Sequence, residues 1–275
     1  MTEILLRSKG SIGIMVEAEV IIPDIFAGKK KEEIEGLIVW QGPVSLPLAE
    51  FFDVDVRIGA GLPEDTGSDG TRPDETSILI EGDVSRVKRI GQGMKAGRIE
   101  IHGSAGMHLG AEMTGGSILV RGDAGSWAGR EMKGGLLHIA GSAADHIGSA
   151  YRGSWRGMTG GEIRIDGSAR SQLGGGLVGG QIVVAGNVEN FCGIRQSGGL
   201  IVVKGSAMRG VGAEMNGGTI AVCGDIRQFS PGFIETGHEE NVKLGDMQLE
   251  GLYAKFTGDY ALGKNPKGSL YCREG

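Results

Sequence analysis

Histidine is the residue type in this 275-residue chain most able to do chemistry, because imidazole binds metals and transfers protons. His108 and His146 stand at equivalent positions of a repeat described below, and Trp127 occupies that position in the copy between them. Two steps of the inter-strand spacing would hold the imidazoles about 9.6 Å apart, which is too far for one zinc ion to bridge. We therefore expect a packing column, continued by Gln172 and Phe191, rather than a metal site.

Acidic residues also recur at one position of the repeat. Glu112 and Glu131 share that position in adjacent copies, and Glu214 repeats it later. Stacked like charges are destabilising unless a cation meets them. Arg130 is the candidate cation within the chain, and a basic patch on a partner protein is the alternative.

Motifs that mark catalytic or cofactor sites are missing from the sequence. There is no Gly-rich phosphate loop, Ser-His-Asp spacing, CxxC pair or HExxH helix, and the Gly-x-x-Gly matches fall at corners of the repeat. Cys192, Cys223 and Cys272 lack metal-ligand spacing and are expected to be small, buried or half-buried residues in a reducing compartment. The sequence therefore predicts no catalytic, cofactor-binding or metal-binding residue in this chain.

An insertion of seven residues in the fourth copy of the repeat is the strongest candidate for function. Insertions in repeat proteins protrude on one face, which is often the binding face. The extended loop, residues 149–157, carries Tyr151, Arg152, Trp155 and Arg156. Because Tyr, Trp and Arg are enriched at interface hot spots, we expect these four side chains to dock a partner subunit. Contact with an anionic substrate and plain decoration of the repeat are the alternatives.

A glycine-rich repeat of 19 residues must position all these side chains. Eight copies can be aligned, of which the first has 21 residues and the fourth has 26. A unit of this length cannot bury its own apolar face, so the copies must stack on one another. They begin at Ser77, Arg98, Ser117, Leu136, Glu162, Gln181, Leu200 and Thr219.

The residues within each copy predict the fold. Positions 2 and 4 are always aliphatic while the residue between them varies, which is typical of a strand with one buried face. Position 6 is always Gly, which we expect to take a backbone conformation closed to other residues. Position 8 is small and position 16 is often Met, which indicates a narrow interior. The predicted class is all-β: a single-stranded, right-handed parallel β-helix of about eight coils, because the hexapeptide subperiod of left-handed coils is absent.

The flanking segments do not repeat and are expected to cap the open ends of the helix. We divide the chain into an N-terminal cap at 1–76, a repeat domain at 77–225 and a C-terminal cap at 226–275. The patterns predict strands at 16–22, 37–40, 52–58 and 268–272, a short helix within 29–37, a loop at 61–75, and a strand or short helix at 249–262.

Composition and charge disfavour several classes of protein function and location. The net charge of −6 disfavours a nucleic-acid partner. The chain has no apolar run long enough to span a membrane, and its first residues lack the apolar core of a signal peptide. We expect a cytoplasmic protein.

Longer stretches of the sequence resemble known families. Residues 103–135, GSAGMHLGAEMTGGSILVRGDAGSWAGREMKGG, are similar to the C-terminal β-helical domain of the large subunit of glutamate synthase. Outside these copies, VEAEVIIPDIFAGKKKEEIEGLIVWQG at 16–42, AYRGSWRGMTGG at 150–161 and GLYAKFTGDY at 251–260 resemble the C subunit of formylmethanofuran dehydrogenase. The resemblance runs over nearly the whole chain.

The resemblance implies a place in an oxidoreductase complex of archaeal one-carbon metabolism. The family's complex reversibly reduces carbon dioxide and attaches it to methanofuran as a formyl group, the first step of methanogenesis. It implies partner subunits that hold a tungsten or molybdenum pterin, an amidohydrolase-like partner with a binuclear metal site, and iron–sulfur partners. The C subunit would hold none of these centres and would act as a rigid, non-catalytic scaffold.

Two other functions remain open at this point. One is the homologous subunit of a formyltransferase/hydrolase complex that releases formate from formylmethanofuran in a methylotroph. The other is a stand-alone β-helical binding module that holds its ligand on the Arg-rich loop.

Overall fold

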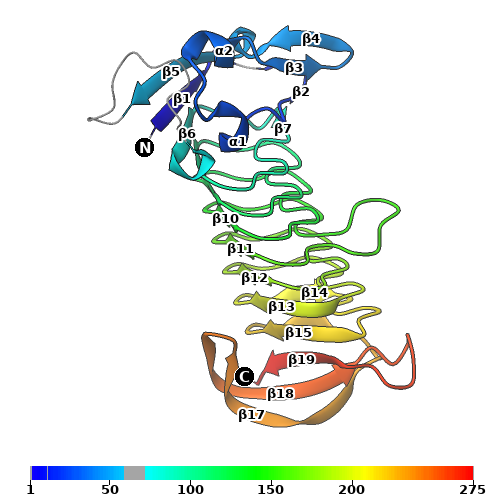
Figure 1. Ribbon diagram of the computed structural model, residues 1–275. Helices are drawn as coiled ribbons and strands as arrows, with labels where there is room; N and C mark the ends of the chain where they lie inside the picture. Colours follow the sequence, from blue (N-terminus) through cyan, green and yellow to red (C-terminus); the bar gives the residue numbers. More distant parts are fainter. Residues whose placement is uncertain (1, 11, 59–71, 275) are drawn as a thin grey trace.

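Strands make up most of the regular structure in the computed structural model, which describes residues 2–10, 12–58 and 72–274 (Figure 1). Thirteen of the strands form a single sheet, and two smaller sheets have two and four strands. The predicted all-β class is therefore confirmed. No described helix is long and apolar enough to cross a lipid bilayer.

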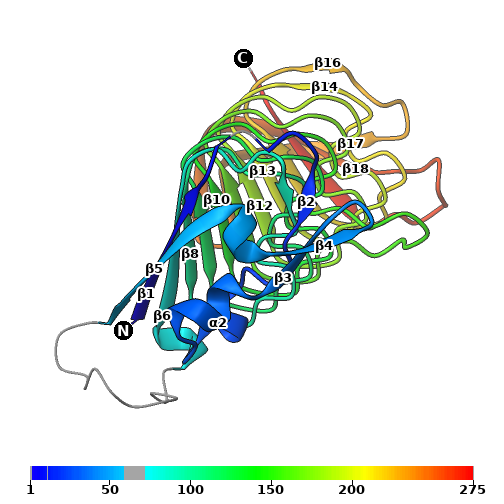
Figure 2. The same cartoon turned by 90° about the horizontal axis from the view of Figure 1, so that it is seen from above.

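Eight parallel strands of the large sheet come from the eight copies of the repeat, which overlie one another when viewed from above (Figure 2). The pairing aligns position 2 with position 2, as in Ile99 with Ile118 and Ile118 with Leu137. Every aliphatic side chain at positions 2 and 4 is at most 1% exposed, and burial of each contributes about 1.5–3 kcal/mol. The predicted register is confirmed. The strands are β6 (Thr76–Glu81), β8 (Arg98–His102), β9 (Ser117–Val120), β10 (Leu136–Ile139), β11 (Glu162–Ile165), β12 (Gln181–Val184), β13 (Ser197–Val203) and β15 (Gly217–Val222).

The glycine at position 6 is required for a different reason from the one we predicted. Among these glycines only Gly82 has a positive φ, of 103°. At Gly186 a Cβ atom would lie 2.6 Å from the carbonyl oxygen of Gly167 in the preceding copy. The close approach of stacked backbones, rather than a left-handed conformation, therefore excludes a side chain here.

The interior of the stack is filled as the sequence predicts. The Met side chains at position 16 are fully buried. At position 8 the residues from Val84 to Ala207 are at most 4% exposed and form parallel bridges such as Ala105 with Ala124, whereas Ile226 in the last copy is half-buried. From Ser104 to Ser206, the polar side chains at position 7 join successive copies, because each accepts a hydrogen bond from the backbone of the next. Asp123 Oδ1 accepts from the Ser142 N–H at 2.7 Å, and Ser142 Oγ accepts from the Ser168 N–H at 3.2 Å.

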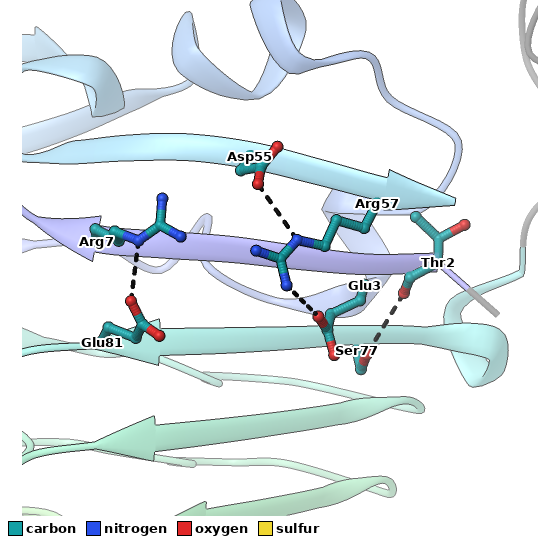
Figure 3. Close-up of polar contacts among 7 residues, drawn as sticks. All are labelled: Thr2, Glu3, Arg7, Asp55, Arg57, Ser77 and Glu81. Atoms are coloured by element: carbon teal, nitrogen blue, oxygen red, sulfur yellow. Dashed lines mark hydrogen bonds and ion pairs between the residues drawn. The ribbon is translucent and has the colours of Figure 1, made fainter. Parts of the chain in front are cut away.

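The N-terminal segment extends the large sheet beyond the repeat. Strand β1 (Thr2–Ser8) pairs in parallel with β6 and antiparallel with β5 (Phe52–Ile58), which forms the edge. Figure 3 shows the ion pairs across this junction, Arg7 with Glu81 at 3.0 Å and Arg57 with Glu3 at 3.5 Å. Alternating charged residues on β5 disfavour pairing with another chain, as expected of an edge strand.

A second sheet of four short strands covers the first copy: β2 (Val16–Glu17), β3 (Ile38–Gln41), β4 (Val44–Pro47) and β7 (Val87–Lys88). The predicted strand at 16–22 is wrong beyond Glu17, because Ile21 turns back to Ala18 and α1 (Pro23–Phe26) begins at the proline. The helix predicted within 29–37 is α2 (Lys31–Glu35). Short 3₁₀ turns follow at η1 (Leu48–Glu50) and η2 (Pro73–Glu75), and most of the predicted loop at 61–75 lies outside the described residues.

The C-terminal segment closes the other end with a hairpin. Strand β19 (Gly268–Arg273) pairs in parallel with β15, and β18 (Met247–Gly258) and β17 (Ile234–Leu244) follow antiparallel. Two further short strands, β14 (Ala207–Arg209) and β16 (Ile226–Gln228), form the two-stranded sheet. The large sheet is therefore mixed, with antiparallel strands at both ends. The division into 1–76, 77–225 and 226–275 stays a prediction.

Candidate partner-docking site

The corner that carries the histidines has a left-handed backbone. His108, Trp127, His146, Gln172 and Phe191 all have φ between 61° and 67°, a region that non-glycine residues rarely adopt. The Trp127 and His146 rings stack 4.1 Å apart at an interplanar angle of 6°, and the His108 and Trp127 rings lie 6.3 Å apart at 17°. The predicted packing column is thus confirmed for these three rings.

Both histidines in this column have a lowered pKa. Burial, reinforced by the positive charges of Arg130, Arg89 and Lys88, lowers the pKa of His108 to about 4. Burial also lowers the pKa of His146. Both imidazoles are therefore neutral at pH 7, and each presents a flat aromatic face with one donor and one acceptor nitrogen.

Arg130 pairs with one of the stacked carboxylates, that of Glu112, as the sequence predicted. The Arg130 side chain is only 10% exposed and forms an ion pair with Glu112. The same guanidinium lies over the ring of Tyr151, with its central carbon 4.5 Å from the ring centroid. Glu131 accepts a hydrogen bond from the Tyr151 N–H at 3.2 Å. The acidic column is therefore tied to the insertion from within the chain.

The insertion leaves and rejoins the corner at neighbouring points. Met158 donates its N–H to the carbonyl oxygen of Gly148 at 3.0 Å, so the stack closes beneath the loop. The buried Ser149 hydroxyl fixes the base of the loop: it donates to the Gln172 carbonyl at 2.5 Å and accepts from the Gly175 N–H at 3.1 Å. The loop projects from the side of the stack in Figures 1 and 2.

The four residues predicted for docking divide into one anchor and three presented side chains. Tyr151 packs edge-on against Trp127, with ring centroids 5.5 Å apart, and beneath Arg130. Trp155 is 68% exposed, the largest value among the exposed large apolar residues described, and the Arg156 guanidinium lies 5.3 Å from its ring centroid. Arg152 and Arg156 are exposed and form no ion pair with any described residue.

A groove of about 360 Å³ lies between the insertion and the corner. The Trp127 and His146 rings line it on the side of the stack, Trp155 and Arg152 line it on the side of the loop, and Arg195 lies among the lining residues. Arg195 already pairs with Glu214 at 2.8 Å. The groove and the loop beside it offer aromatic faces and the guanidinium groups of Arg152 and Arg156, neither of which has an ion-pair partner among the described residues. These groups suit a protein surface that presents apolar and acidic side chains.

The contact between Arg130 and Tyr151, which fixes the insertion, was not predicted from the sequence. Arg130 was identified only as a partner of the carboxylates, whereas it also holds Tyr151 by a cation–π contact. The signal in the sequence was an Arg beside Glu131, in the copy directly before an insertion whose third residue is aromatic.

Elsewhere the described residues offer no metal ligand set. No group of three His, Cys, Asp or Glu side chains in the described ranges is placed to hold a metal ion. The cysteines are free, and burial raises the pKa of Cys192 and of Cys272 to about 12. Both thiols are therefore poor nucleophiles at neutral pH.

Comparisons with known proteins find relatives of both the repeat and the segments that flank it. A family model described as the GXGXG motif matches residues 77–250, more than half of the chain. The chain is 71% identical over 271 residues to the C subunit of molybdenum-containing formylmethanofuran dehydrogenase 1 of Methanosarcina barkeri, covering 98% of this chain and 86% of that protein.

Two further relatives are more distant. The chain is 42% identical over 110 residues to the C subunit of tungsten-containing formylmethanofuran dehydrogenase 2 of Methanothermobacter wolfeii, covering 40% of this chain and 37% of that protein. Its structure is similar to a chain in the crystal structure of the formyltransferase/hydrolase complex of Methylorubrum extorquens in complex with methylofuran. That similarity has a TM-score of 0.81 and 26% identity, and covers 98% of this chain and all of the other.

Proposed function

Because this chain belongs to the family of formylmethanofuran dehydrogenase C subunits, we propose that it is the non-catalytic structural subunit of such an oxidoreductase complex. The observation that carries the proposal is the 71% identity to a named C subunit over 98% of the chain. That alignment extends over the two flanking segments and the insertion, which the GXGXG repeat alone does not specify.

We propose that the repeat winds as a right-handed, single-stranded parallel β-helix of about eight coils. The parallel pairing of equivalent residues at 19-residue steps supports the coil. Continuous columns of buried Ile and Val make such a rod stiff, because each copy is packed from both sides. A stiff rod can hold several partner subunits at fixed distances.

The redox chemistry is assigned to partner subunits. The family implies a tungsten or molybdenum pterin, a binuclear metal site and iron–sulfur clusters in pterin-binding, amidohydrolase-like and iron–sulfur partners. The sequence of this chain supplies no ligand motif for any of them. We propose that its contribution is to position these partners and that it carries no catalytic residue.

The insertion is proposed to dock one of the partners. Trp155 presents a large exposed aromatic surface on a loop whose base is fixed by Ser149 and Tyr151. A pre-ordered loop loses little conformational entropy on binding, so its contacts add directly to affinity. Arg152 and Arg156 add charge that selects an acidic partner surface.

The structural similarity to the formyltransferase/hydrolase complex keeps that complex as the second candidate. The two settings differ in chemistry, because a dehydrogenase complex transfers electrons and a hydrolase complex only releases formate. A stand-alone binding module is the third candidate and requires no partner.

Purification of the tagged chain from its native host would separate the three. We expect co-elution with metal-bearing subunits and reduction of an electron-acceptor dye when formylmethanofuran is added. Co-elution with formate release and no dye reduction would favour the hydrolase complex. Elution of the chain alone would contradict both complexes.

The docking role of the insertion is tested by Arg152→Ala combined with Trp155→Ala. We expect the double variant to fold normally, because both side chains are exposed, and to lower the recovery of at least one partner subunit by about tenfold or more, as hot-spot losses of about 2 kcal/mol or more would give. Leu252→Ala is the matched control, since Leu252 is 43% exposed on β18. Normal assembly of the double variant would refute the docking role.

A further inference from the structure

Exposed apolar side chains also gather on the N-terminal sheet. Ile14 is 64% exposed, Met15 38%, Trp40 46% and Val44 51%. Ile14, Met15 and Trp40 line one hollow together with Glu17 and Lys88. Large apolar residues grouped around charged ones are typical of a protein interaction surface.

Contacts through Glu17 and Arg89 link this hollow to the corner that carries the insertion. In the small sheet, Trp40 on β3 lies opposite Glu17 on β2, and Glu17 lies opposite Lys88 on β7. Residues directly opposite one another on neighbouring strands share a face, so these three side chains lie on one face of the sheet. The Glu17 carboxylate contacts Lys88 Nζ at 3.6 Å and Arg89 Nε at 3.3 Å. Arg89 has the same left-handed backbone as the histidine corner, with φ 67°, and bonds through its N–H to the copy that contains His108.

The result is a stripe along one side of the stack. We call it the corner stripe and define it as Trp40, Glu17, Arg89, His108, Trp127 and the insertion 149–157. Both views show the hairpin β3–β4 and the insertion on the same side of the stack (Figures 1 and 2). Five inter-strand steps from β3 to the fourth copy make the stripe about 24 Å long. That length is comparable with the width of a standard interface, which buries about 800 Å² on each partner.

We infer that the corner stripe is one continuous docking face and that both Trp40 and Trp155 lie against one and the same partner subunit. The inference rests on the proposed function and deepens it, because it states which two parts of this chain the same partner touches. A rigid partner of ordinary size that docks on the insertion extends over this distance.

Charge defines the chemistry of that partner. Within the described residues Arg152 and Arg156 lack a carboxylate partner, and the exposed Glu19 beside the hollow lacks a cation. The partner therefore presents carboxylates opposite the insertion and a lysine or arginine opposite Glu19, with apolar side chains between them. This polarity fixes the orientation in which the partner docks.

Site-specific photo-cross-linking in the assembled complex tests the inference. A benzophenone amino acid is placed at position 40 in one preparation and at position 155 in another. Cross-linked subunits are then identified by mass spectrometry. We expect both positions to capture the same co-purifying protein, with position 252 as the control of matched exposure, which we expect not to capture it.

Other results would overturn the inference in distinguishable ways. Capture of different subunits at 40 and 155, or no capture at 40, would refute the single docking face while the proposed function stands. A chain that purifies without partners would refute the proposed function itself.

A charge variant tests the same inference without cross-linking, in case chains that carry the benzophenone amino acid fail to assemble. Glu19→Lys should lower the recovery of the same partner that the Arg152→Ala and Trp155→Ala variant loses, by about threefold or more, and leave other subunits bound. Unchanged recovery of that partner would contradict the inference.

Discussion

The stack and the insertion differ in what determines each residue. In the stack, a side chain is fixed by the equivalent side chain in the copies on either side, and Ile165 is 1% exposed between Ile139 and Val184. In the insertion, residues 151–156 are all exposed and only Tyr151 is held by the corner. The first region therefore specifies the fold and the second is available for recognition.

The difference teaches how a repeat protein acquires a site. Seven residues were accommodated without disturbing the stack, because Met158 still occupies its buried position and bonds back to Gly148. The repeat tolerates additions only where the chain already faces solvent. Substitutions in the two regions should accordingly change different properties.

Ile165→Asp should have the largest effect. It places an unpaired carboxylate in the stacked interior, at a cost of about 4–5 kcal/mol or more, which is a large part of the stability of an ordinary domain. The measurement is the urea midpoint of the purified chain, with Arg164→Ala as control because Arg164 is exposed on the same strand. Equal midpoints for the two variants would contradict the assigned register.

Gly186→Ala should have an intermediate effect. Its Cβ would lie 2.5 Å from Ser168 Oγ and 2.6 Å from the Gly167 carbonyl oxygen. Relief of this overlap requires the copies to shift, at a cost of about 1–3 kcal/mol. Gly13→Ala is the matched control, since nothing lies within 4 Å of its Cβ and its φ is not left-handed. A loss of stability no larger than that of the control would mean that the stack adapts easily.

His108→Gln should have the smallest effect, which is a change in how stability depends on pH. The pKa of His108 falls from 6.5 to about 4 on folding, so the unfolded chain binds the proton more readily. The stabilisation is complete above pH 6.5 and is lost as the pH falls towards 4. His108→Gln should therefore weaken the decline of the urea midpoint between about pH 7 and pH 4.5. A decline as steep as that of the unchanged chain would assign it to other groups.

Sequence patterns predicted the stack well because its residues repeat. The spacing of Ile99, Ile118 and Leu137 gave the register directly, since identical positions must lie side by side. Strand β17 was missed because its sequence, IETGHEENVKL, is mostly exposed and shows no apolar alternation. The predicted strand at 16–22 was too long, because Ile21 and Ile22 are buried in a turn rather than in a strand. A turn produces no periodic pattern of apolar residues that would distinguish it in the sequence.

The site was only partly predictable. The insertion is visible as extra length in one copy, and its aromatic and basic residues indicate binding. Tyr151 anchors the loop because the Arg130 guanidinium lies over its ring, whereas Trp155 is left exposed. The position of the Arg130 side chain is a result of the fold and cannot be predicted from composition. The left-handed backbone at His108 and Trp127 was also hidden, because glycine does not mark it there.

Deletion of residues 150–156 tests the central claim most directly, because it returns the fourth copy to 19 residues. Gly157 already lies next to Ser149, since its Cβ would be 2.9 Å from both Ala150 N and the Gly148 carbonyl oxygen. Thermal unfolding and partner recovery are measured on the same preparation. We predict a melting temperature within a few degrees of the full chain and loss of at least one partner subunit. A shortened chain that assembles normally, or one that fails to fold, would contradict the separation of scaffold from docking loop.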